Sequence, residues 1–98
     1  MQFLIIAHDA TDIEALNRRM EARDAHIAHI ATAKAAGHAK MGAALLSEEG
    51  IMNGSCIIAE FEDRAALDAW VATDPYVLHS VWGSLQIQQC KIAPSFVS

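Results

Sequence analysis

A short apolar run near the start of the chain is followed by segments of helical and strand periodicity. Residues 3–7 are continuously apolar, a pattern typical of a strand that is buried on both faces of a sheet. Alternate side chains of a strand point to opposite faces, so Leu4 and Ile6 share one face. Phe3 and Ile5 share the other. Both faces of this strand therefore need a cover.

The next segment predicts a long helix. Thr11 or Asp12 is suited to cap its start, and Gly37 is a good stop signal. We therefore expect a helix from about residue 13 to Gly37. Apolar residues recur in it at helical spacing, at Ile13, Leu16, Met20, Ile27 and Ile30.

Two strand patterns follow and predict a hairpin. The first covers residues 39–46 and the second residues 54–61, with the turn signal Ser47-Glu48-Glu49-Gly50 between them. Apolar residues alternate along the second strand, which places them on one face of the sheet. They are Ile57, Ala59 and Phe61.

The last third of the chain predicts a helix, a helical turn and a strand. Asp63 is placed to cap the helix, which we expect to end near Thr73. A short helical piece over residues 75–80 and a strand over residues 84–92 complete the pattern. The inner side of the helix is predicted to carry Ala66, Leu67, Trp70 and Val71.

The element order β-α-β-β-α-β, in one domain over residues 1–98, predicts an α+β fold of the ferredoxin-like sandwich type. Its four-stranded antiparallel sheet has the expected strand order 4-1-3-2, with both helices on one face. The other face of the first strand is apolar and open, and burial contributes about 1.5–3 kcal/mol for each such side chain. We therefore expect a homodimer that packs sheet against sheet.

Composition narrows the function classes. Apolar residues make up 53% of the chain and charged residues 19%, which favours a packed core over disorder. A net charge of −5 with scattered basic residues argues against a nucleic-acid partner. The apolar run at the amino terminus is too short for a membrane span or a signal peptide, so we expect a cytoplasmic protein with no membrane contact.

Cysteine and histidine spacing argues against a bound metal or cofactor. Cys56 and Cys90 lack metal spacing and are predicted to be small buried hydrophobes without a disulfide. The histidines match no strong zinc or iron pattern, and no glycine-rich phosphate loop is present. A metal site is the main chemical rival, and its potential ligands are His8, Asp9, His26, His29, His38 and His79.

The tripeptide Asp74-Pro75-Tyr76 follows the second predicted helix. Proline fixes its own φ and moves the preceding residue out of the helical region. Asp74 is therefore expected at a helix end, where its carboxylate can cap the N–H groups that follow.

Three segments together resemble the YciI (YCII-related) family. Arg23-Asp24-Ala25-His26 resembles its Arg-x-x-His motif, and Gly54-Ser55 with the strand after it resembles its third strand. Residues 64–77, which include Asp74-Pro75-Tyr76, are similar to its second helix and Asp-Pro-Tyr signature. The resemblance covers nearly the whole chain. It implies a ferredoxin-like fold, dimeric in the manner of α+β barrels, with a site centred on a histidine and an aspartate.

The resemblance places the catalytic pair at His26 and Asp74, and substrate-binding positions at Arg23, Ser55 and Tyr76. A carboxylate within hydrogen-bond reach of one imidazole nitrogen fixes the tautomer and leaves the other nitrogen free to move a proton. Arg23 lies one helical turn before His26, where it can hold a substrate carboxylate. No serine or cysteine lies in a recognisable nucleophile motif.

Each of these positions also has a structural interpretation. His26 can be a half-buried histidine with its hydrogen bonds satisfied, and Arg23 a solvated helix residue. Tyr76 can be a core residue, and Ser55 can serve the entry into its strand.

The chain departs from the family pattern at two points. The family usually has a glycine soon after Asp-Pro-Tyr-Val, where this chain has His79-Ser80; it often has Gly-Pro where this chain has Gly42-Ala43. Both changes can reshape the wall of a pocket.

Two functional hypotheses remain from the sequence. The first is a small cofactor-independent enzyme of lyase or isomerase type that acts on a small acidic or lactone-like metabolite. The second is a non-catalytic dimeric module that binds a small ligand or serves as an accessory to a larger enzyme.

Overall fold

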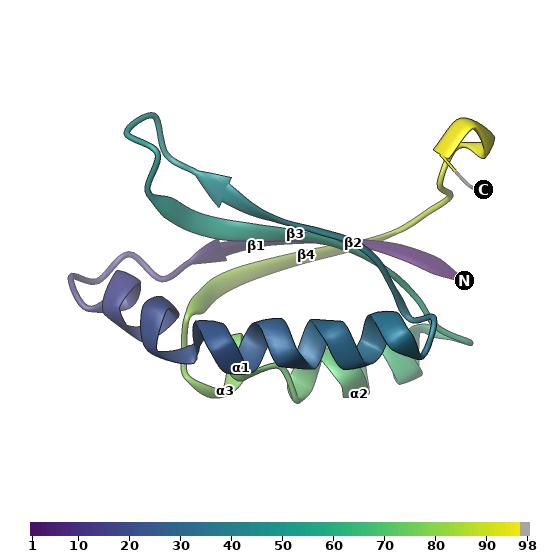
Figure 1. Cartoon of the computed structure of the whole chain (residues 1–98), viewed down its shortest axis with the longest axis horizontal. Helices are drawn as coiled ribbons and strands as arrows, with labels where there is room; N and C mark the ends of the chain where they lie inside the picture. Colours follow the sequence, from purple (N-terminus) through teal and green to yellow (C-terminus); the bar gives the residue numbers. More distant parts are fainter. Residues whose placement is uncertain (97–98) are drawn as a thin grey trace.

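Four antiparallel strands form one sheet, and all three α-helices lie against one of its faces (Figure 1). The computed structural model describes residues 1–96. In chain order the elements are β1 (Gln2–Asp9), α1 (Ala15–Ala35), β2 (Ala39–Leu46), β3 (Met52–Glu60), α2 (Arg64–Ala72), α3 (Pro75–Leu78), β4 (Trp82–Cys90) and a short 3-10 turn (Pro94–Phe96).

The sheet has the strand order β2-β3-β1-β4. β1 is central, and it pairs antiparallel with β3 on one side and with β4 on the other. β2 and β3 form the expected hairpin, whose turn contains Gly50 at a φ of +81°. This topology confirms the predicted ferredoxin-like fold and its strand order.

β4 begins and ends two residues earlier than predicted, over Trp82–Cys90 in place of residues 84–92. Its pairing with β1 continues past a register shift as far as Asp9, which lies opposite Trp82. At the other end, the Ile92 N–H leaves the sheet and donates to the side-chain oxygen of Gln2 at 2.7 Å. β3 likewise begins at Met52, two residues earlier than expected.

The main core lies between the sheet and the helices. Phe3 and Ile5 of β1 are buried against Leu67 and Val71 of α2. Leu4 and Ile6 point to the opposite face and stay partly exposed. The period-2 pattern of β1 therefore divides its side chains between a covered face and an open one, as predicted.

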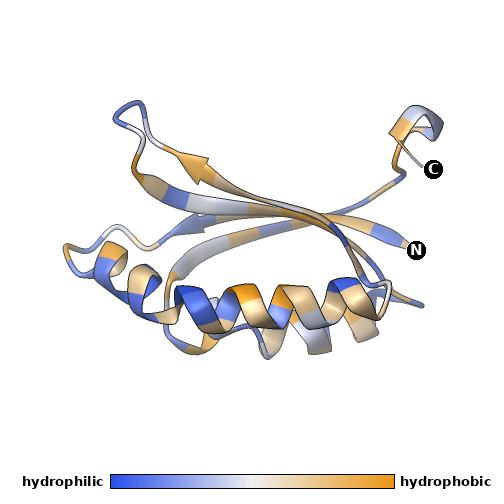
Figure 2. Ribbon diagram, viewed as in Figure 1, coloured by the Kyte–Doolittle hydropathy of each residue, from blue (hydrophilic) through white to orange (hydrophobic). Residues whose placement is uncertain are grey.

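The buried face of α1 differs from its apolar stripe. Ile13 precedes the helix and is 94% exposed, while Leu16, Met20 and Ile27 are 40–49% exposed. The face that packs inward carries small residues and one arginine, namely Ala15, Arg19, Ala22 and Ala33. Alanines allow the helix backbone to approach the sheet closely. Ile30 of the predicted stripe does pack against the main core. Figure 2 shows the mixture of apolar and polar residues along α1.

The helix ends confirm most of the predicted stop and start signals. Asp63 caps α2 by accepting the Ala66 N–H at 2.8 Å, and Gly37 follows α1 with a φ of +84°. The start of α1 was predicted less well: Asp12 accepts the Glu14 N–H at 3.3 Å in a preceding turn, and the helix begins at Ala15. No helix in residues 1–96 is long and apolar enough to span a membrane.

Cys56 and Cys90 are free, as expected, but they are only partly buried, whereas buried residues were predicted. Cys56 lies opposite Ile6, and Cys90 lies opposite Gln2 on the other side of β1. Both therefore point to the sheet face that the helices leave uncovered, which explains their exposure, and β1 separates them.

Candidate functional site

His26 and Asp74 meet between α1 and the start of α3. The His26 Nδ1 lies 2.7 Å from the Asp74 Oδ1. A carboxylate only accepts, so Nδ1 carries the proton and a neutral ring has Nε2 as its free acceptor. The side chain of Asp74 is almost fully buried, and that of His26 is 12% exposed. The structure thus brings together the two residues that the resemblance pairs.

Pro75 holds Asp74 in place for this contact. Asp74 has extended backbone geometry before the first residue of α3, which is Pro75. Its Oδ1 also accepts the Tyr76 N–H at 2.9 Å. Capping and histidine orientation are therefore combined, because the same carboxylate oxygen serves both.

Tyr76 is sandwiched between two residues of α1. Its ring stacks on His26 with centroids 3.9 Å apart and an interplanar angle of 10°. The guanidinium carbon of Arg19 lies 4.6 Å from the centre of the same ring. Arg19 and His26 are two helical turns apart, about 10 Å along the axis, so the ring lies between them. Tyr76 is 1% exposed, so these stacked contacts are buried.

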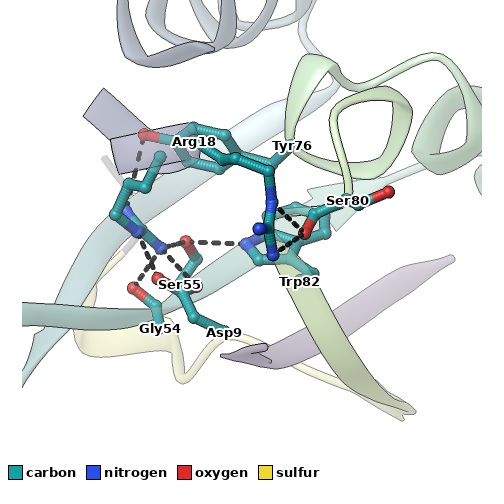
Figure 3. Close-up of polar contacts among 8 residues, drawn as sticks. Asp9, Arg18, Gly54, Ser55, Tyr76, Ser80 and Trp82 are labelled. Atoms are coloured by element: carbon teal, nitrogen blue, oxygen red, sulfur yellow. Dashed lines mark hydrogen bonds and ion pairs between the residues drawn. The ribbon is translucent and has the colours of Figure 1, made fainter. Parts of the chain in front are cut away.

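Arg19 is the residue of the site that the sequence analysis missed. Its guanidinium is buried and makes a two-pronged ion pair with Asp9, at 2.7 Å from Nε and 3.1 Å from Nη2. The two N–H groups of Nη2 are shared with the Gly54 carbonyl at 2.7 Å and the Ser55 Oγ at 2.8 Å as well as with Asp9. Figure 3 shows these contacts around Asp9, Gly54 and Ser55. The available signal was its spacing of seven residues from His26, which places both on one helix face.

Gly54 is needed where β3 passes the site. A Cβ at this position would lie 2.6 Å from the Ala7 carbonyl oxygen of β1 and 2.9 Å from the Leu45 side chain. The strands would have to move apart to admit any other residue, and the carbonyl that Arg19 binds would move with them.

A cavity of about 310 Å³ opens between α1, α3 and the β2–β3 side of the sheet. Its polar lining consists of Arg19, Arg23, His26, Ser55 and Tyr76, and its apolar wall of Ile27, Ile30 and Ile57. All the candidate residues other than the buried Asp74 thus line one cavity, with Arg19 added. No acidic side chain of residues 1–96 lines it, because Asp9 and Asp74 lie behind their partners.

Small residues on β2 leave room for this cavity. Gly42, Ala43 and Ala44 form its floor at the edge of the sheet. Gly42-Ala43 is one of the two departures from the family pattern, so that departure does lie in the pocket wall. The other departure is separate: Ser80 is absent from the lining and adopts a φ of +56°.

The hydroxyl of Tyr76 is held in its neutral form. Burial raises its pKa above the usual value of 10.0, and the nearby charges of Arg19 and Arg23 offset part of that increase. A neutral phenol keeps its proton and can donate a hydrogen bond.

The other histidines are dispersed rather than gathered for a metal. His29 stacks on Trp70 and His38 stacks on Phe61, toward the far end of α1. His8 is exposed on the open side of β1. Within residues 1–96, no three histidine, cysteine or acidic side chains gather in a group suited to hold a metal ion.

Solved structures with this architecture include an enzyme and a dimeric protein. 5-chloro-2-hydroxyhydroquinone dehydrochlorinase (TftG) from Burkholderia phenoliruptrix AC1100, in complex with 2,5-dihydroxybenzoquinone, has a TM-score of 0.82 and 24% identity, with 97% of this chain and 98% of that chain covered. A dimeric ferredoxin-like protein of unknown function from Jannaschia sp. CCS1 has a TM-score of 0.52 and 14% identity, covering 93% of this chain and 98% of that chain. At these identities the likeness shows the fold alone.

Sequence comparison shows the family. Protein YciI of Escherichia coli O6:H1 is 32% identical over 97 residues, which cover 93% of this chain and 97% of that protein. Protein YciI of Shigella flexneri matches to the same extent. Residues 1–91 also match the YCII-related domain. The chain therefore belongs to the YCII-related family.

Proposed function

We propose that this protein is a small acid–base enzyme of the lyase or isomerase type, which uses His26 and Asp74 to move a proton on a small acidic metabolite. The observation that carries the proposal is the 2.7 Å contact between His26 Nδ1 and Asp74 Oδ1 beside the cavity that His26 lines. A buried carboxylate that orients an imidazole toward a cavity is a common arrangement for general acid–base chemistry.

Each member of the pair has a separate role in this proposal. Asp74 holds the Nδ1 proton and stabilises the imidazolium that forms when Nε2 accepts a proton from the substrate. The same proton can then return from Nε2 to a different substrate atom, or to a leaving group, which completes an isomerisation or an elimination. The pair itself moves the proton, so these steps consume no cofactor.

Charge and volume restrict the substrate. Arg23 lines the cavity and no carboxylate of residues 1–96 does, whereas the charge of Arg19 is compensated by Asp9. Arg23 therefore favours an anionic or electron-rich oxygen compound. A volume of about 310 Å³ lies at the lower end for small-molecule sites. The name of the dehydrochlorinase, which shares the fold, describes a single-ring hydroquinone substrate. A ring of that size, or a small lactone, suits the volume of this cavity.

The open face of the sheet favours a dimer, which fits a second candidate function, a non-catalytic dimeric module, as well as it fits the enzyme. Leu4, Ile6 and Ile58 are only partly covered on the face opposite the helices. A second copy of the chain packed on this face would bury them, and we propose a homodimer of this kind in either case. A dimeric module would bind its ligand in the same cavity without converting it.

Turnover separates the two functions. The parent protein, His26→Ala and Asp74→Asn are incubated with a panel of small hydroxylated ring acids and lactones, and product is followed by chromatography. Turnover that is lost in both variants while ligand binding persists supports the enzyme. Binding by the parent without any turnover supports the module, and equal turnover in all three proteins contradicts the proposed roles.

A further inference from the structure

The Ser55 hydroxyl is prevented from acting as an acceptor toward a ligand. Its Oγ accepts one hydrogen bond from Arg19 Nη2 at 2.8 Å and another from the Trp82 indole Nε1 at 3.1 Å. A hydroxyl has two acceptor lone pairs and one proton, so both acceptor sites are filled. Figure 3 shows the two contacts converging on Ser55.

The Ser55 proton therefore remains to be donated. Ser55 is 4% exposed, and within residues 1–96 its hydroxyl donates to no protein acceptor. Ser55 does line the cavity, where a ligand oxygen can accept this proton. Two N–H donors on Oγ, one of them cationic, also polarise the O–H bond and strengthen it as a donor.

Tyr76 offers a second hydroxyl of the same kind. Its oxygen lies 3.5 Å from Arg19 Nη1, a long contact in which it can only accept. Its own proton has no acceptor among residues 1–96, and Tyr76 also lines the cavity. The two hydroxyls thus contact adjacent nitrogens of a single guanidinium.

Arg19 contacts both hydroxyls, and its own positive charge is compensated by Asp9. The side chains of Arg19 and Asp9 are 2% and 6% exposed. Burial and the two hydrogen bonds between them hold the guanidinium rigidly. Nη2 shares its two N–H groups among Asp9, the Gly54 carbonyl and the Ser55 hydroxyl, and Nη1 lies 3.5 Å from the Tyr76 oxygen. Donors that are fixed before a ligand arrives need no reorganisation when charge develops.

We propose that Ser55 and Tyr76 form a pair of hydroxyl donors for an oxyanion that develops on the substrate, with Arg19 as the residue that positions both. The inference rests on the proposed function, and it adds the substrate class: a carbonyl or phenolic compound whose oxygen faces the two hydroxyls. When His26 Nε2 takes a proton from the carbon next to a carbonyl, the C–H electron pair forms a C=C bond. The carbonyl π electrons then move to the oxygen that the hydroxyls hold.

A chromophoric phenol tests the donor pair without knowledge of the substrate. Para-nitrophenol is a single ring whose phenolate absorbs visible light, so its ionisation in the cavity can be measured directly. We expect the bound probe to ionise at lower pH than the free probe. Ser55→Ala and Tyr76→Phe should each reduce the ionisation constant of the bound probe roughly ten- to hundredfold, as expected for a hydrogen bond to a charged oxygen.

Matched variants distinguish a change in the ionisation of the bound phenol from a loss of folding and from general attraction of anions to the cavity. Ser84→Ala removes a serine of β4 that pairs with His8 on the open face, and it should leave the probe unchanged. Tyr76→Phe keeps the ring that stacks on His26, so it decides the case if Ser55→Ala fails to fold. Arg23→Gln should weaken binding of both phenolate and benzoate, whereas the hydroxyl variants should change the ionisation of the phenol.

Several outcomes overturn the inference. They are a probe that does not bind, a bound probe that stays neutral in the parent protein, or equal ionisation in the parent and both hydroxyl variants. The proposed function fails separately, through absence of turnover in the parent. If the parent protein shows no turnover but ionises the bound phenol in a way that depends on Ser55 and Tyr76, the donor pair is supported as a binding feature.

Discussion

The imidazole of His26 lies flat on the phenol ring of Tyr76, 3.9 Å away at 10°. Tyr76 also supplies the backbone N–H that binds the Asp74 oxygen to which His26 is bonded. A single residue after proline therefore fixes both the aspartate and the plane of the histidine. Tyr76 therefore orients His26 through ring stacking, in addition to any role of its hydroxyl.

Tyr76 should make the protein sensitive to alkaline pH. Burial raises its pKa above 10.0, so the folded state holds the phenol proton at pH values where the unfolded chain has begun to lose it. The stability that this provides is complete below about pH 10 and is lost as pH rises through the pKa of the folded state. Because Tyr76 is the sole tyrosine, ultraviolet absorbance of phenolate follows its titration directly. Urea unfolding should show a loss of stability at high pH that Tyr76→Phe lacks, and parallel losses in the two proteins would contradict this account.

Arg19 and Asp9 should show strong energetic coupling. Arg19→Met leaves the Asp9 carboxylate buried without its partner, so we expect a loss of about 3–5 kcal/mol in the free energy of unfolding. Asp9→Leu should cost a similar amount. The double variant should recover much of the loss, because no uncompensated charge remains. Urea denaturation of the four proteins measures the coupling, and additive losses would show that the ion pair does not govern the stability.

Arg18 provides the matched control for the buried ion pair of Arg19. It bonds the exposed Asp12 at 2.7 Å, and exposed ion pairs contribute little to stability because water and salt screen them. Arg18→Met should therefore cost far less than Arg19→Met, although the two arginines are neighbours in the sequence.

These two arginines also mark the limit of what the sequence could predict. Periodicity and caps located the elements, because strand and helix spacing and signals such as Asp63 and Gly37 are local. The rigid Asp-Pro-Tyr segment was local as well. Nothing local distinguishes Arg18, which reaches the Ser80 carbonyl at the surface, from the buried Arg19. Which of the two arginines is buried depends on contacts with Asp9 and β3, and only the tertiary fold brings these close to α1. The same reason hid the buried alanine face of α1 behind its apolar stripe.

Asp74 should contribute more to stability than Asp63, although both cap helices. Asp63 makes one capping bond at an exposed site, and Asp63→Ala should cost about 1 kcal/mol. Asp74 is 1% exposed and binds both the Tyr76 N–H and His26. Asp74→Ala leaves these buried donors unsatisfied, so we expect a cost of about 2–4 kcal/mol. Chemical denaturation compares the two, and equal costs would argue that the His26 contact adds no stability.

The proposed homodimer predicts that charge on the open sheet face will separate the subunits. Ile58→Lys introduces a charge beside Leu4, its neighbour on β1, and should convert a dimer to monomer in sedimentation at micromolar concentration. Leu78→Lys is the matched control, because Leu78 is 66% exposed on α3, on the helix side of the sheet. A parent protein that sediments as a stable monomer would rule out this dimer.

Ser80 is the residue where a glycine should improve the protein. It adopts a φ of +56°, the left-handed region, without being glycine, and this costs an ordinary residue about 1–2 kcal/mol. Ser80→Gly removes that strain, while the greater freedom of glycine in the unfolded chain offsets part of the gain. The net effect should be a stabilisation of about 0.5–1 kcal/mol, with the Arg18 contacts retained because they use the Ser80 backbone carbonyl. His79→Gly is the matched control: its φ is −101°, so glycine there should destabilise. Thermal unfolding of both variants measures the difference, and a loss of stability in Ser80→Gly would show that the serine side chain outweighs the strain.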